Sequence, residues 1–156
     1  MIDTRSKYWI EPRNKPGLLF ALMKALSSTN SLISFEGWLK ELEFENILGT
    51  RLAETELLKR STIEPKLDFV VLPLTEITVP KVWKIIKDHL KKPDSGIIHV
   101  QIEKNDELLF GGYDNFHRDC VVASAGVPIE ILQSLKECGV IRDYQKVNVS
   151  QHRWHD

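Results

Sequence analysis

The chain has 156 residues, of which 42% are hydrophobic and 28% are charged, a composition typical of one ordinary globular domain. Its 21 basic residues are balanced by 22 acidic residues, so it lacks the positive field with which proteins bind nucleic-acid phosphates. Residues 1–11 contain no apolar run typical of an export signal, and no stretch approaches the roughly 18 apolar residues of a membrane span. We therefore expect a single cytoplasmic domain over residues 1–156 that binds neither nucleic acid nor membranes, with Cys120 and Cys138 reduced.

The first 38 residues predict a strand, a helix and a second strand. Residues 7–11 are short and aromatic, as in a strand, and the turn-rich stretch 12–17 ends them. Apolar residues then recur at helical spacing over 18–26, and residues 32–38 alternate between apolar and polar side chains. These patterns predict a helix of roughly three turns followed by a half-buried strand.

The middle of the chain predicts an insertion, a strand and a second helix. Residues 39–66 show only short apolar stretches, so we interpret them as an insertion of loops and helical turns. Residues 67–72 form a nearly continuous apolar run, which favours a buried central strand ended by Pro73. Thr78 is a suitable cap for a helix that follows, and Gly96 lies beyond its end.

Beyond the second helix, two strands at 98–103 and 107–110 form the clearest hairpin. A short apolar strand is expected at 120–123, and Pro128 begins a last helix that Gly139 ends. Residues 140–149 are expected to add a final extended segment.

The order of elements over residues 7–103 is βαββαβ. It predicts an α+β, ferredoxin-like sandwich with two helices on one face of an antiparallel sheet, interrupted by the insertion 39–66. The C-terminal extension 104–156 would enlarge this sheet with its hairpin and cover the added part with its helix. One core is expected to contain Leu18, Leu22, Leu26, Phe69, Val71, Val82, Ile86, Val100 and Ile102.

The stretch Asn14-Lys15-Pro16-Gly17-Leu18-Leu19 resembles the loop between the first strand and first helix of the ACT domain, a ferredoxin-like module that senses amino acids. Pro16 and Gly17 allow backbone amides to gather at a helix N-terminus, where a carboxylate can bind. The resemblance implies an amino-acid site near Asn14, Gly17 and Leu18, often shared across a homodimer in that family.

The strongest charge asymmetry lies between positions 36 and 56. Six glutamates oppose Lys40 and Arg51, a local excess of four negative charges carried by Glu36, Glu41, Glu43, Glu45, Glu54 and Glu56. This stretch is either a solvated insertion or an acidic surface that attracts a basic protein partner, as an inhibitor of a nuclease requires. In the second interpretation Glu41, Glu43 and Glu45 supply attraction, and Trp38 and Phe44 supply apolar anchors.

The segment 111–117 has the most unusual local composition. Two glycines precede Tyr113, Asp114, Asn115, Phe116 and His117, which suits either a structural turn or a binding loop. An enzyme would require Cys120 as a nucleophile with His117 as its base and Asp119 as the residue that orients it. A zinc site can also be written from His117, Cys120, His152 and His155.

We therefore expect a non-enzymatic binding protein, such as a bacterial toxin-neutralising protein, whose contacts are Trp38, Glu41, Glu43, Phe44, Glu45, Tyr113, Asp114, Phe116 and His117. We assign no catalytic residue, cofactor or metal ligand. The two alternatives are an ACT-like amino-acid sensor using Asn14, Gly17 and Leu18, and an enzyme built on His117 and Cys120. The partner is a protein or a small molecule, and a homodimer is compatible with the sequence.

Overall fold

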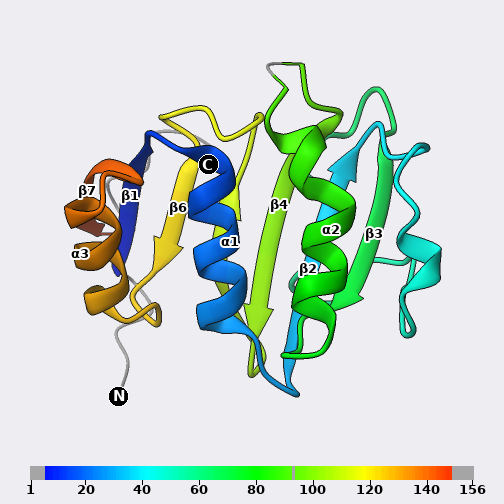
Figure 1. Cartoon of the computed structure of the whole chain (residues 1–156), viewed down its shortest axis with the longest axis horizontal. Helices are drawn as coiled ribbons and strands as arrows, with labels where there is room; N and C mark the ends of the chain where they lie inside the picture. The colour runs from blue at the N-terminus through cyan, green and yellow to red at the C-terminus, as the bar shows by residue number, and fades with distance from the viewer. Residues whose placement is uncertain (1–5, 93, 149–156) are drawn as a thin grey trace.

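The computed structural model describes residues 6–92 and 94–148. It is an α+β structure of one antiparallel sheet and three helices, as the sequence predicts (Figure 1). The helices are α1 (Lys15–Leu26), α2 (Thr78–Leu90) and α3 (Ile129–Glu137), with a short 3₁₀ turn η1 (Phe44–Asn46). The strands are β1 (Ser6–Pro12), β2 (Ser31–Gly37), β3 (Asp68–Pro73), β4 (Ile97–Lys104), β5 (Glu107–Gly112), β6 (Val121–Ser124) and β7 (Ile141–Asn148).

The sheet has seven strands in the order β3-β2-β4-β5-β6-β1-β7, and every neighbouring pair is antiparallel. Two split βαβ units lie at its ends. In one, α2 connects the parallel strands β3 and β4 across β2, and in the other, α3 connects β6 and β7 across β1. The predicted hairpin is the β4–β5 pair, which lies at the middle of the sheet.

The chain order of the predicted βαββαβ unit is correct, but the sheet is larger than that unit, and the ferredoxin-like arrangement is not confirmed. Strand β1 pairs with β6 and β7, far from β2, β3 and β4. The reason is that β5 and β6 occupy the free edge of β4, so β1 joins the sheet beyond them. The C-terminal extension therefore separates the strands of the predicted core instead of following its last strand.

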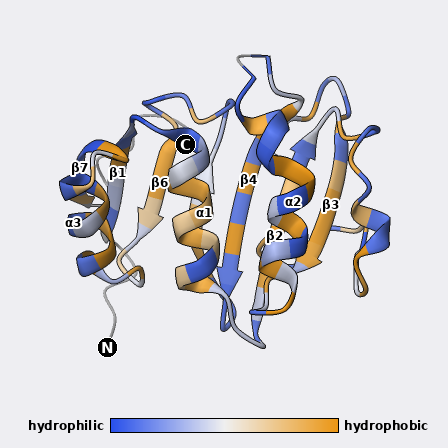
Figure 2. Ribbon diagram, in the orientation of Figure 1, coloured by the Kyte–Doolittle hydropathy of each residue, from blue (hydrophilic) through white to orange (hydrophobic). Residues whose placement is uncertain are grey.

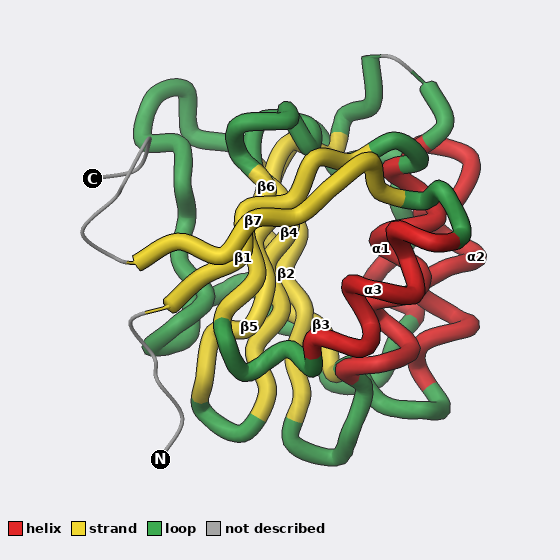
Figure 3. Tube along the Cα trace, turned by 90° about the vertical axis from the view of Figure 1, so that its left-hand side faces the viewer, coloured by secondary structure: helices red, strands yellow, loops and turns green. Residues whose placement is uncertain are grey.

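All three helices cover one face of the sheet (Figure 3). Local signals fix where they begin and end. The Asn14 side chain caps α1 by accepting the Gly17 N–H at 3.0 Å. Before α2, Thr75 Oγ1 accepts the Thr78 N–H and Thr78 Oγ1 accepts the Thr75 N–H in return. The side chain that caps a helix amide is therefore Thr75, and the prediction of Thr78 as the cap is wrong. Gly139 ends α3 in the left-handed region, at φ +77°.

The main core lies between the helices and the sheet. Figure 2 shows hydrophobic and hydrophilic residues alternating around α2, whose apolar side faces the strands. Most of the predicted core residues belong to this cluster, but Phe69 and Val71 do not. They lie on the opposite face of β3 and form a second cluster with Leu58 of the insertion.

Strand β3 is at one end of the sheet, so its prediction as a central strand is wrong. Its apolar run has another cause, because Val70 and Leu72 face the helices while Phe69 and Val71 face the insertion. The outer edge of β3 is also partly paired, since Arg51 and Val71 exchange two backbone hydrogen bonds of 2.9 and 2.8 Å. A strand covered on both faces thus resembles a central strand in sequence.

Within residues 6–92 and 94–148, no helix combines the length and the apolar character needed to cross a lipid bilayer.

Candidate functional site

The insertion, residues 39–66, contacts both faces of the sheet. Phe44 and Ile47 pack in the main core beside β2 and β3, and residues 55–62 are attached to the face that the helices leave open (Figure 3). The Glu36 carboxylate of β2 is 1% exposed and accepts the backbone N–H groups of Ser61 and Thr62, at 2.7 and 3.2 Å. Thr55 donates its hydroxyl to Glu103 of β4 at 3.1 Å. Together with Leu58 in the second apolar cluster, these contacts hold the insertion as an ordered layer.

His99 of β4 connects this layer to the loop that follows β5. Its Nδ1 accepts the Asp114 N–H at 3.1 Å, and its Nε2 lies 2.7 Å from the Thr62 hydroxyl. Because a backbone N–H can only donate, Nδ1 carries no proton, and the neutral ring donates from Nε2 to Thr62. Burial lowers the pKa of His99, while the nearby carboxylates of Glu36 and Asp114 act in the opposite direction.

The outer surface of the insertion, together with the adjoining Trp38, exposes an unusually high number of large apolar side chains. Four of the six large hydrophobic residues that are exposed in the described chain lie between positions 38 and 63: Trp38, Leu48, Leu52 and Ile63. Trp38 is 60% exposed and Leu48 is 95% exposed. The glutamates at 41, 43, 45, 54 and 56 are exposed around them, so the segment combines apolar and acidic groups.

Two expectations about this surface are corrected. Phe44 is only 4% exposed and stacks on Phe35 with ring centroids 5.1 Å apart, so its side chain is not available to anchor a partner. Glu36 faces the interior and does not belong to the acidic surface. Trp38, Glu41, Glu43 and Glu45 are exposed, as a contact surface requires.

Clefts border the insertion on two sides. One of about 470 Å³ lies against β3 and includes Leu52, Glu45 and Lys66. Another of about 600 Å³ includes Trp38, Glu41 and His89, and extends to the loop before β4. The exposed apolar residues Leu52 and Trp38 thus each lie at a recess, which is how interface anchors are commonly arranged.

The loop after β5 is compact and partly internal. Tyr113 N–H donates to the Cys120 carbonyl at 2.9 Å and closes the loop. Asp114, Asn115 and Phe116 all have left-handed backbones, with φ of 53°, 56° and 60°. Left-handed backbone is costly for residues other than glycine, so this turn needs support from its surroundings.

That support comes from buried rings. Phe116 packs against Phe110, and any side chain at Gly112 would collide with the Phe116 ring. The Tyr113 hydroxyl accepts from the Gln101 amide at 3.0 Å, and burial raises the pKa of Tyr113. Of the four residues predicted to contact a partner here, Tyr113 and Phe116 are therefore buried, and Asp114 and His117 are exposed.

The catalytic alternative gains no support from this loop. Burial, followed by the negative charges of Asp114 and Asp119, raises the pKa of Cys120 and disfavours the reactive thiolate. His117 accepts the Asp119 N–H through Nδ1 at 3.2 Å. Among the described residues no group of three His, Cys, Asp or Glu side chains is placed to hold a metal ion, and the histidines at 152 and 155 lie outside those residues.

The structure brings the loop after β5 to the start of α1, because Lys15 Nζ donates to Asn115 Oδ1 at 2.5 Å. Burial lowers the pKa of Lys15.

The backbone amides at the start of α1 that were expected to bind an amino-acid carboxylate already donate hydrogen bonds within the chain. Gly17 N–H donates to the Asn14 side chain, and Leu18 N–H donates to the Asn14 carbonyl at 2.9 Å.

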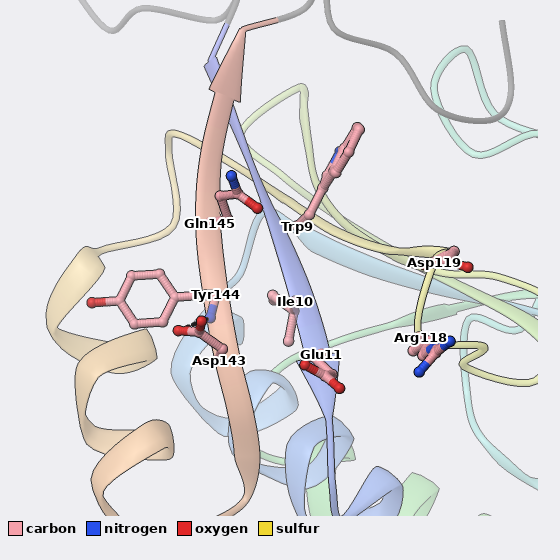
Figure 4. A pocket seen from close by; sticks show the side chains of 8 residues that line it. All are labelled: Trp9, Ile10, Glu11, Arg118, Asp119, Asp143, Tyr144 and Gln145. Carbon is pink, nitrogen blue, oxygen red and sulfur yellow. Dashed lines mark hydrogen bonds between the residues drawn. The ribbon is translucent and has the colours of Figure 1, made fainter.

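A further cleft of about 310 Å³ lies where the same loop meets β1 and β7 (Figure 4). Trp9 and Gln145 are directly opposite each other on the two strands, and Arg118 and Asp119 reach the cleft from the loop. Its lining carries charges of both signs. None of the residues predicted to bind a partner lies in it.

Four polar residues with long side chains are buried although the sequence predicts them to be exposed: Glu36, His99, Gln101 and Glu103. They alternate with apolar residues along β2 and β4, a pattern that predicts solvent exposure. They are buried because the insertion and the loop after β5 cover that face, and neither segment has a periodicity that predicts its position.

Comparisons with protein-family models, with curated proteins and with solved structures gave no match.

Proposed function

We propose that this chain is a non-enzymatic binding protein that recognises a basic protein partner through the outer surface of the insertion. The observation that carries the proposal is the coincidence of two features on one ordered segment. Four of the six exposed large hydrophobic residues lie between positions 38 and 63. Five exposed glutamates lie between positions 41 and 56, where Arg51 is the only basic residue. Large apolar side chains that gather in one exposed segment, as Leu48 and Leu52 do, are typical of a contact surface.

The two features have different effects on binding. Burial of Trp38, Leu48 and Leu52 against a partner removes apolar surface from water and slows dissociation. The glutamates attract a basic partner over a longer range and raise the association rate, an effect that salt weakens. Because the insertion is already fixed to β2 and β4, little conformational entropy is lost when it binds.

Neutralisation of a bacterial toxin is the role that suits this chemistry best. An enzyme that cuts nucleic acid presents positive charge to the phosphate backbone, and an acidic protein surface is complementary to that charge. Such an inhibitor acts by occlusion and needs no catalytic group. The raised pKa of Cys120 is compatible with this role.

Capture from the native cell tests the proposal. The wild-type chain and a Glu41→Lys, Glu43→Lys, Glu45→Lys variant are used as baits, and bound proteins are identified by mass spectrometry. The matched control is Asp88→Lys, Glu130→Lys, Glu137→Lys, which changes the charge equally at exposed residues of α2 and α3.

We expect a basic protein to be retained by the wild type and by the control, and to be lost from the insertion variant. Equal capture by all three baits, or loss with the control alone, would place the interface elsewhere. The charged tip of the loop after β5, at Asp114 and His117, would then be the next surface to test.

A further inference from the structure

A groove on the helix face is bordered by basic residues, whereas the insertion carries exposed glutamates. It has a volume of about 950 Å³ and lies at the C-terminal end of α1 and the N-terminal end of α2. Its apolar lining centres on Phe20 and Trp83, whose rings stack with centroids 4.5 Å apart, and on Ile77, which is 72% exposed. Ile77 is also the one large exposed hydrophobic residue on α1, α2 and the turn between β3 and α2.

The rim of this groove is basic. Lys24, Lys84 and Lys87 border it, and Glu76 is the only carboxylate among its lining residues. Lys24 Nζ lies 4.4 Å from the centre of the Phe20 ring, so this charge is close to the apolar floor. The groove therefore suits a segment that offers apolar side chains together with carboxylates.

Among the described segments that expose apolar side chains beside carboxylates, residues 43–52 of the insertion offer two leucines and two glutamates. Leu48 and Leu52 are exposed there, beside the exposed carboxylates of Glu43 and Glu45. The segment is anchored beside β3 in its own molecule, because Arg51 pairs with Val71 and Phe44 packs in the main core against Phe35. The groove lies instead between the C-terminal end of α1 and the N-terminal end of α2 (Figures 1 and 3).

We infer that the groove between α1 and α2 binds residues 43–52 of a second copy of this chain. Leu48 and Leu52 contact the Phe20 and Trp83 rings, and the lysines of the rim pair with Glu43 and Glu45. The contact joins two unlike surfaces, so each copy offers one groove and one insertion. Self-association then covers the leucines that a basic partner would contact, and the two interactions compete.

Charge reversal on each surface tests the inference. Sedimentation is measured from low micromolar to about 1 mM, the weak end of specific affinities. The variants are Lys84→Glu, Lys87→Glu in the groove and Glu43→Lys, Glu45→Lys in the insertion. The control Lys81→Glu, Lys91→Glu makes the same charge change on exposed lysines that do not line the groove.

We expect the wild type and the control to self-associate, and each surface variant to lose at least about tenfold in association constant. An equimolar mixture of the groove and insertion variants should regain association, because the intact groove of one variant meets the intact insertion of the other, and the two reversed surfaces are also complementary. Leu48→Ala, Leu52→Ala should weaken association without a charge change, and circular dichroism confirms that each variant is folded.

A wild type that stays monomeric over the whole range overturns the inference, as do surface variants that associate normally or a mixture that stays monomeric. The result is separate from that of the proposed function, because the groove variant leaves the insertion intact and should still capture a basic partner.

Discussion

Acidification is expected to lower the free energy of unfolding through one residue, His99, which connects the insertion to the sheet. In the folded chain its Nδ1 accepts the Asp114 N–H, which leaves no room for a proton on that atom. Protonation of Nδ1 therefore replaces this hydrogen bond with two N–H groups that point at each other. It also places a positive charge in a largely buried position, and the negative charges of Glu36 and Asp114 offset that cost only in part. Tyr113 also packs against this ring, with centroids 5.8 Å apart.

The direction and size of the effect follow from proton linkage. The pKa of His99 is lowered in the folded state, whereas the unfolded chain titrates near about 6.5. Stability from His99 is therefore fully present above that pH and is lost as the pH falls from about 6.5 to the folded pKa. Because one proton is involved, the free energy of unfolding can change by at most about 1.4 kcal/mol per pH unit.

Urea unfolding between pH 7.5 and pH 5 measures this effect when the wild type is compared with His99→Gln. Glutamine retains a donor for Thr62 and does not titrate, so the free-energy difference between the two proteins should shrink as the pH falls. His117→Gln is the matched control, because it removes one exposed histidine without touching the contacts of His99. A difference that stays constant across this range, or grows on acidification, would refute the reasoning.

Further predictions concern the core, the helix ends and the ligand site. Phe44→Ala should lower the free energy of unfolding by about 3–5 kcal/mol in urea, because Phe44 is buried against Phe35. Asn14→Ala should cost about 1 kcal/mol through loss of the α1 cap. Gly139→Ala should destabilise the chain by about 1 kcal/mol or more, because its φ of +77° is strained for alanine. Millimolar amino acids should not raise the melting temperature, since the Gly17 and Leu18 amides are already bonded; a clear rise with one amino acid would restore the ACT-like alternative.

Local patterns were sufficient for the elements themselves. The apolar spacing of residues 18–26 and the alternation of 32–38 predict α1 and β2 within a few residues of their observed bounds. The positive φ of Gly139 agrees with its predicted role at the end of α3. These features depend on neighbours in the sequence, which is why they can be inferred from it.

Strand order and burial of polar residues could not be inferred in this way. The position of β1 depends on which edge of β4 is occupied by β5, a contact between distant segments. The burial of Glu36 and His99 depends on an insertion whose path is set by single hydrogen bonds to Ser61 and Thr62. For the candidate site, Glu41, Glu43 and Glu45 are exposed as expected, whereas Phe44 is buried and Leu48 and Leu52 are the exposed apolar residues.

Hydrogen exchange of the chain bound to its captured partner locates the interface most directly. If the insertion is the recognition surface, amide protection on binding should concentrate within residues 38–63, and exchange at α3 should not change. Protection confined to the loop 113–119 or to the helix face, with the insertion unaffected, would contradict the proposed function.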